Sequence, residues 1–111
     1  MRYKEKFKVV TLCGSVRIGK ELWDKMAHDL SLKGIIVLKV DVWEDGTGIY
    51  ERCHNGDLQE AKKMLDEMHK AKIEMSDFIY VLNKNGYIGE STRSEIDYAK
   101  SLGKPIEYFE G

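Results

Sequence analysis

Residues Thr11–Glu21 have the types and spacing of a phosphate-binding loop. They read TLCGSVRIGKE, in which four residues separate Gly14 from the pair Gly19-Lys20. This spacing is typical of enzymes that hydrolyse nucleoside triphosphates, but their loop needs Ser or Thr after the lysine to bind magnesium. The residue at that position is Glu21, which excludes a magnesium-dependent loop of this kind.

Gly14, Ser15 and Arg17 could bind an anion in a simpler way. They follow an apolar run and precede an expected helix, whose unpaired N–H groups and dipole favour a negative charge. Gly14 allows the backbone to approach a ligand closely, and the Arg17 guanidinium can bind a phosphate through two hydrogen bonds. An ordinary strand-to-helix turn with a solvated arginine fits the same residues, and both interpretations stay open.

A second polar loop leads into a helix that carries Glu95. In the segment GESTRSEIDYA, Thr92 and Glu95 have the spacing of a capping box, in which the glutamate satisfies the backbone at the start of the helix. The same carboxylate could instead act on a substrate. A role in capping and a role in chemistry are both open from these residues alone.

The pattern of apolar residues predicts alternating strands and helices. Apolar runs rich in β-branched residues predict strands. Apolar residues that recur every three or four positions predict helices, one with a methionine-rich stripe expected in the core. The expected strands are residues 7–15, 35–43, 77–83 and 104–110, the expected helices are 19–33, 57–75 and 93–102, and the main loops are 44–56 and 84–92.

This alternation predicts a small doubly wound α/β fold. Right-handed crossovers would give a parallel sheet of four or five strands with helices on both faces. Ligands of such sheets bind beyond the carboxyl ends of the strands, where the strand order reverses. The loops at residues 13–19 and 83–92 would meet there, so the two candidate segments are expected at the same end of the sheet.

Size and composition exclude several classes of protein. The chain has 111 residues, 42% of them apolar and 33% charged, with a net charge of −1. This predicts one globular domain, residues 1–111, without a basic surface for nucleic acid. No apolar run approaches the roughly 20 residues of a membrane span, and no signal peptide is recognisable. We therefore expect a cytoplasmic protein in which Cys13 and Cys53 are free thiols and Cys13 is a small core residue.

Residues 9–109 resemble the nucleoside 2-deoxyribosyltransferase-like superfamily, which includes the 2'-deoxynucleoside 5'-phosphate N-hydrolases. The matching features are the strand end CGSVR at residues 13–17 and the pair Ser76-Asp77 that opens the third expected strand. A glycine-containing loop then leads to Glu95, which is followed by the small residue Ala99. The order and spacing of these features carry the resemblance, since none of them is distinctive alone.

The resemblance implies a flavodoxin-like fold and an enzyme that cleaves or transfers the N-glycosidic bond of a nucleoside or nucleoside 5'-monophosphate. Glu95 matches the family's nucleophile, which attacks C1' of the sugar. A carboxylate suits this role because it stabilises an oxocarbenium-like transition state and can then be displaced by water or by an incoming base. The implied substrate-binding residues come from both loops: Cys13, Gly14, Ser15, Arg17, Gly89, Glu90, Ser91, Thr92 and Arg93.

The resemblance also implies the partners of the protein. It predicts no metal and no cofactor, and a small-molecule nucleoside or nucleotide as ligand. The charge balance and the short apolar runs predict neither a nucleic acid polymer nor a membrane as partner. Members of the family are often oligomers, so we expect a homodimer or higher homo-oligomer with Trp23, Trp43 or the last helix at the contact.

The chain departs from the family pattern at two positions. A tyrosine that the family places two residues before the CGS segment is Thr11 here. The family's general acid is an aspartate, and counting back eight residues from Asp77 gives His69. Histidine can deliver a proton near neutral pH, and Asp66, one turn earlier on the same helix face, could hold or replace it. Without the resemblance, His69 would be taken for a partly exposed polar residue.

Two further hypotheses follow from these departures. The chain could be a module that binds or senses nucleotides without cleaving them, because the missing tyrosine and aspartate would allow catalysis to be lost. It could also be a structural or partner-docking domain. Tyr87 could stack on a base and His54 could reach the site, although single residues of these types are more often structural or solvated.

Overall fold

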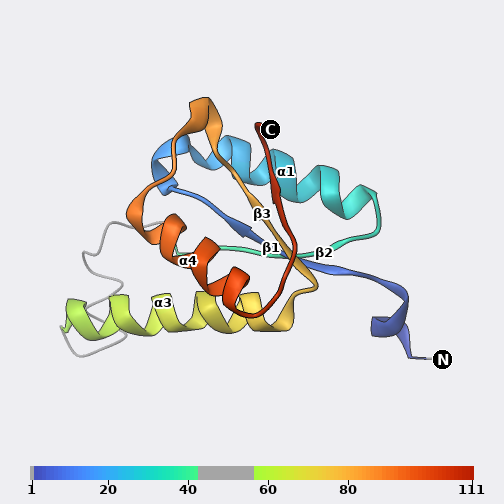
Figure 1. The fold of residues 1–111 in the computed structure, drawn as a ribbon, viewed down its shortest axis with the longest axis horizontal. Coiled ribbons are helices and arrows are strands. Elements are labelled where there is room, and N and C mark those ends of the chain that lie inside the picture. The colour runs from blue at the N-terminus through green and yellow to red at the C-terminus, as the bar shows by residue number, and fades with distance from the viewer. Residues whose placement is uncertain (1, 43–56) are drawn as a thin grey trace.

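The computed structural model describes residues 2–42 and 57–111 of the chain (Figure 1). Short 3-10 turns form at Tyr3–Lys6, Val16–Ile18 and Lys84–Gly86. The strands are β1 (Val9–Cys13), β2 (Ile36–Leu38), β3 (Phe78–Val81) and β4 (Ile106–Tyr108), and the helices are α1 (Lys20–Leu32), α3 (Leu58–Met75) and α4 (Glu90–Ser101). The expected loop at residues 44–56, with Cys53 and His54, and the last residue of the expected strand at 35–43 lie outside the described part of the chain.

The four strands form one parallel sheet in the order β2-β1-β3-β4. Figure 1 shows α1 on one side of this sheet and α3 and α4 on the other. The chain first places β2 beside one edge of β1 and then crosses over to place β3 beside the other edge. The strand order therefore reverses between β1 and β3. The predicted doubly wound α/β fold is confirmed, and the reversal defines the end of the sheet at which such folds bind ligands.

Alternation along β1 distributes its side chains between two buried clusters. Val10 and Leu12 pack with Trp23 and other residues on the α1 side. Cys13 points to the opposite face, where its cluster includes Ile73 of α3 together with Ile79, Val81, Ile96 and Ala99. Successive side chains of a strand point to opposite faces of the sheet, and this period directs Cys13 toward the two helices that carry the other candidate residues.

Gly14 lets the segments that follow β1 and β3 lie against each other. A Cβ atom at residue 14 would lie 3.1 Å from Leu82 Cβ and 3.3 Å from the Leu82 carbonyl oxygen. The Leu82 amide also donates to the Cys13 carbonyl at 2.8 Å, which extends the β1–β3 pairing past the strand ends. Packing therefore explains this glycine without a ligand.

The start of α4 differs from the prediction. The helix begins at Glu90 with Gly89 as its N-cap, three residues before the expected start at residue 93. Of the two roles left open for Glu95, the capping box with Thr92 does not form, because Thr92 lies in the first turn of the helix and is 2% exposed. Glu95 is consequently not needed to close the helix start.

Three side chains are placed differently from their expected environments. Met64 and Met68 were expected in the core, but they are 37% and 45% exposed, whereas Ala61 and Ile73 on the same helix are buried. Trp23 was expected at a subunit contact, but it is a fully buried residue of α1.

None of the helices in residues 2–42 and 57–111 combines the length and the apolar character that a bilayer span requires.

Candidate functional site

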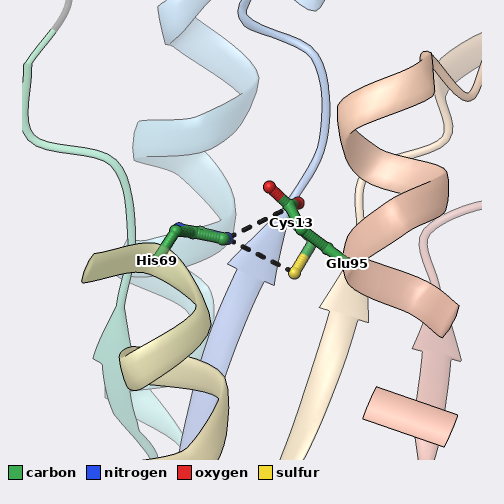
Figure 2. Close-up of side chains that lie close together, drawn as sticks. All are labelled: Cys13, His69 and Glu95. Atoms are coloured by element: carbon green, nitrogen blue, oxygen red, sulfur yellow. Dashed lines mark hydrogen bonds and ion pairs between the residues drawn. The ribbon is translucent and has the colours of Figure 1, made fainter. Parts of the chain in front are cut away.

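Cys13, His69 and Glu95 meet at the carboxyl end of β1. Figure 2 shows the three side chains converging from the last residue of β1, from α3 and from α4. His69 Nε2 lies 3.6 Å from Cys13 Sγ and 3.6 Å from Glu95 Oε1. The three residues are separated by dozens of positions in the sequence, so their meeting is a product of the crossover from β1 to α3 and α4.

Local patterns explain why each of these side chains points inward. His69 lies one helical turn before the buried Ile73 on α3, and Glu95 lies one turn before the buried Ala99 on α4. Residues four positions apart occupy the same face of a helix, so both groups share the faces that cover the sheet. Cys13 is fully buried, His69 is 7% exposed and the Glu95 side chain is 17% exposed.

Burial sets the protonation of all three groups. Burial raises the pKa of the Cys13 thiol well above its ordinary value, and the neighbouring Glu95 raises it further. Burial and the positive charge of Lys72 lower the pKa of His69 to about 4. Burial also raises the pKa of Glu95 to about 7, against the hydrogen bond of Cys13, which lowers it. At neutral pH the thiol and the imidazole are thus uncharged, and the carboxyl group is close to half ionised.

His69, Glu95 and Asp66 line one cavity of about 250 Å³. Its wall also contains Val16 from the segment after β1 and residues 40–42 after β2. Asp66 and His69, which were expected on one helix face, both line this wall. The cavity brings the three residues predicted to be catalytic into one space beyond the carboxyl end of the sheet.

Arg17 lines a different cavity. That cavity, of about 330 Å³, is formed by Arg17, Ile18, Lys84, Asn85 and Tyr87. It shares no lining residue with the Glu95 cavity, although the consecutive residues Val16 and Arg17 each line one of the two. The loops after β1 and β3 do meet, as expected for a doubly wound sheet, but they build a cationic and aromatic cavity beside the acidic one.

The turn after β1 already uses several of the amides that were expected to hold an anion. Ser15 Oγ accepts a hydrogen bond from the Arg17 amide at 3.1 Å. The amides of Ile18 and Gly19 donate to the carbonyls of Ser15 and Val16, and Trp23 Nε1 also donates to the Ser15 carbonyl. Ser15 therefore has a structural role, the amides of residues 17–19 are engaged within the turn, and the Arg17 side chain is exposed.

The predicted binding residues at 89–93 are spread over the first turn of α4. Ser91 lines a small cavity of about 120 Å³ together with Glu95, Asp66, Lys70 and Ser94. Thr92 is buried, whereas Glu90 and Arg93 are exposed and line neither this cavity nor the two described above. Of this segment, Ser91 is thus the residue that the structure brings to Glu95.

Lys72 and Lys84 are wall residues that the sequence analysis did not single out. Lys72 lines the Glu95 cavity, donates to the Lys39 carbonyl at 2.7 Å and lies 3.9 Å from Asp41. Its spacing of three from His69 is the signal that placed it on the same helix face. Lys84 lies beside Arg17 and Tyr87, and nothing in the sequence separated it from other surface lysines.

The thiol is not suited to act as a nucleophile here. The reactive form of cysteine is the thiolate, and burial strongly disfavours it at Cys13. Glu95 has an ionisable oxygen on a cavity wall and a pKa about 7, so it is the group of the three that can react at neutral pH.

In comparisons with known proteins, no family model matches the chain and no curated protein is significantly similar to it.

Proposed function

We propose that the protein cleaves, or transfers across, the N-glycosidic bond of a nucleoside or nucleoside 5'-monophosphate, with Glu95 as the nucleophile. The observation that carries this proposal is the position of Glu95, whose buried carboxyl group lines a cavity together with Asp66 at the carboxyl end of β1. Enzymes that cleave glycosidic bonds usually act through a pair of carboxyl groups that face the same substrate.

In the proposed reaction the Glu95 carboxylate attacks C1' of the sugar. The bond between C1' and the base nitrogen breaks, its electron pair leaves with the base, and a glycosyl ester forms on Glu95. Water, or a second base, then attacks C1' and releases the carboxylate. The nucleophile must be ionised, and a pKa of about 7 makes the ionised form abundant above neutral pH.

Asp66 is proposed to direct a proton from water to the leaving base. His69 occupies the position of the family's acid, but its pKa of about 4 leaves it neutral under the conditions in which Glu95 is ionised. A neutral imidazole 3.6 Å from Glu95 is better suited to position that carboxylate. Asp66 faces the same cavity from the preceding turn of α3, and its carboxyl group is proposed to hold the water molecule that protonates the base as the bond to C1' breaks.

The cavity at Arg17 supports a phosphate on the substrate. Arg17 and Lys84 supply two cations, and Tyr87 supplies an aromatic ring. Because Val16 and Arg17 are adjacent and line different cavities, a substrate that crosses this point would present its sugar to Glu95 and its anionic group to Arg17. Guanidinium and ammonium groups are the usual protein ligands of phosphate.

A module that binds nucleotides without cleaving them is the second candidate. It is favoured by the neutral state of His69 at the position where the family has an acid. The same two cavities would then hold a ligand, and Glu95 would contact a sugar hydroxyl.

The decisive experiment is incubation of the chelator-treated protein with a panel of ribo- and deoxyribonucleosides and their 5'-monophosphates. Chromatography would measure the free base, with and without a second base as acceptor. Release of base from at least one substrate is expected. Calorimetric binding of a nucleotide without any base released over hours would instead favour the second candidate, and neither binding nor release would refute both.

We also propose that the protein belongs to the nucleoside 2-deoxyribosyltransferase-like superfamily and works in the cytoplasm as a homo-oligomer. The free thiol of Cys13 and the features shared with that family support these proposals. Light scattering at micromolar concentration tests the oligomer, and a monomer there would contradict it.

A further inference from the structure

We propose that Cys13, His69 and Glu95 bind one divalent ion of the zinc type. One ligand atom from each residue lies within 4.8 Å of the others, and these atoms converge from β1, α3 and α4 (Figure 2). Among residues 2–42 and 57–111, this is the group of three or more His, Cys, Asp and Glu side chains whose donor atoms are close enough to share an ion.

The separations match those of ligands around tetrahedral zinc. Zinc lies about 2.3 Å from a thiolate sulfur and about 2.0–2.2 Å from an imidazole nitrogen or a carboxylate oxygen. At the tetrahedral angle these bonds place sulfur about 3.6 Å from nitrogen, and nitrogen about 3.4 Å from oxygen. The observed distances from His69 Nε2 are 3.6 Å to Cys13 Sγ and 3.6 Å to Glu95 Oε1, so an ion requires only small side-chain movements.

The types of donor select the class of metal. A thiolate, an imidazole and a carboxylate together suit Zn²⁺ or Co²⁺, whereas Mg²⁺ and Ca²⁺ prefer sites made of oxygen ligands alone. Binding would convert the Cys13 thiol into a metal-bound thiolate, and both the thiol proton and any proton still on Glu95 would pass to solvent. The ion would thereby replace the hydrogen bond of His69 with Cys13 and its 3.6 Å contact with Glu95 by three metal–ligand bonds.

The fourth coordination position would face the cavity. His69 and Glu95 line that cavity, whereas Cys13 is fully buried behind them. Three protein ligands with one open position are typical of zinc sites that exchange water or small ligands. The cavity also provides the path by which the ion enters, and Asp66 on its wall adds negative charge that attracts a cation.

The bound ion would block the proposed reaction, because Glu95 cannot attack C1' while its oxygen is bound to a metal. This consequence rests on the proposed function, whereas metal binding itself does not. Zinc would then act as an inhibitor that competes with the substrate for one carboxylate.

Spectroscopic titration tests the site without any measurement of activity. The full chain, without a histidine tag, is stripped with a chelator, kept reduced and titrated with Co²⁺. One ion per chain is expected, with a thiolate-to-cobalt charge-transfer band and the strong visible bands of tetrahedral Co²⁺, and both should disappear when Zn²⁺ is added. Absence of these bands at millimolar Co²⁺ would overturn the proposal.

Matched variants assign the ligands. Cys13→Ser should abolish the charge-transfer band, whereas Cys53→Ser should keep it. Glu95→Gln should weaken Zn²⁺ binding at least tenfold, whereas His28→Gln, which removes an exposed imidazole, should leave the affinity unchanged. If Cys13→Ser does not fold, the Cys53→Ser and Glu95→Gln results decide, and a band that is lost in Cys53→Ser or unaffected in Glu95→Gln would contradict the site. Cobalt binding, together with no base released from any substrate by the metal-free protein, would refute the proposed function alone.

Discussion

His69 Nε2 lies 3.6 Å from Glu95 Oε1, and burial moves the pKa values of these two side chains in opposite directions. The pKa of His69 is lowered to about 4 and that of Glu95 is raised to about 7. Between these two pH values the pair is largely uncharged in the folded protein. The carboxylate that the proposed reaction needs thus appears only as the pH approaches and passes neutrality.

The pair predicts opposite pH dependences of stability in two single variants of the metal-free protein. Glu95 has an ordinary pKa of 4.5, so it binds its proton more tightly when folded and lowers the unfolding free energy as the pH rises from 4.5 to about 7. His69 has an ordinary pKa of 6.5, so it binds its proton less tightly when folded and raises stability from about pH 4 to 6.5. Relative to the wild type, stability should therefore rise with pH in Glu95→Gln and fall in His69→Gln.

Urea denaturation in the presence of a chelator, at several pH values between 4 and 8, measures these slopes. Opposite signs for the two variants are expected, because each variant retains the partner whose effect the other has lost. Slopes of the same sign in both variants would show that burial does not separate the two pKa values.

Glu95→Gln should abolish turnover while the fold is retained. Removal of a nucleophile typically costs a thousandfold or more in kcat, roughly, and glutamine is nearly isosteric with glutamate. Glu90→Gln is the matched control, because Glu90 begins the same helix but is exposed. Circular dichroism would verify folding of both variants, and a Glu95→Gln protein as active as the Glu90→Gln protein would disprove the assigned nucleophile.

Arg17→Ala should weaken the use of nucleoside monophosphates more than that of nucleosides. A hydrogen bond to a charged group is worth about 1.5–3 kcal/mol, so KM for a monophosphate should increase roughly ten- to hundredfold. Arg93→Ala removes the same charge from the exposed first turn of α4 and serves as the comparison. If Arg93→Ala produces the selective increase and Arg17→Ala does not, the phosphate binds at α4 and not at the Arg17 cavity.

Gly14→Ala should destabilise the protein by about 1–3 kcal/mol, the usual cost of forcing extra volume into a packed site. The added Cβ would meet Leu82 Cβ at 3.1 Å and Trp23 Cζ2 at 3.4 Å. Gly111→Ala is the control, since nothing lies within 4 Å of a Cβ atom at the C-terminal residue. Thermal or urea unfolding measures both variants, and equal stabilities would mean that the β1 and β3 ends separate without cost.

Local patterns in the sequence were sufficient to predict most of the fold. The apolar period of α1 and the glycine at residue 34, with its positive φ of 81°, determined where a helix forms and stops. The apolar runs predicted all four strands, although each observed strand is shorter than expected because pairing ends before the apolar residues do. The alternation of these elements then restricted the topology to a doubly wound sheet, which is the observed one.

Some local predictions failed because the same spacing of residues fits more than one local structure. Thr92 and Glu95 have capping spacing, but Gly89 begins the helix three residues earlier and Thr92 is buried within it. Met64 and Met68 continue the apolar stripe of α3, yet they are 37% and 45% exposed, because periodicity defines a helix face and does not define how far the sheet beneath it extends.

The sequence by itself determined that Cys13 ends a buried strand, and the family resemblance singled out His69, Asp66 and Glu95 on two helices. The tertiary structure alone decided that Cys13 and His69, 56 residues apart in the chain, share a contact with Glu95, and that Arg17 faces a separate cavity. The physical reason is that strand and helix periods are local properties of the chain. Contacts between distant residues depend instead on how α3 and α4 pack against each other across the end of β1.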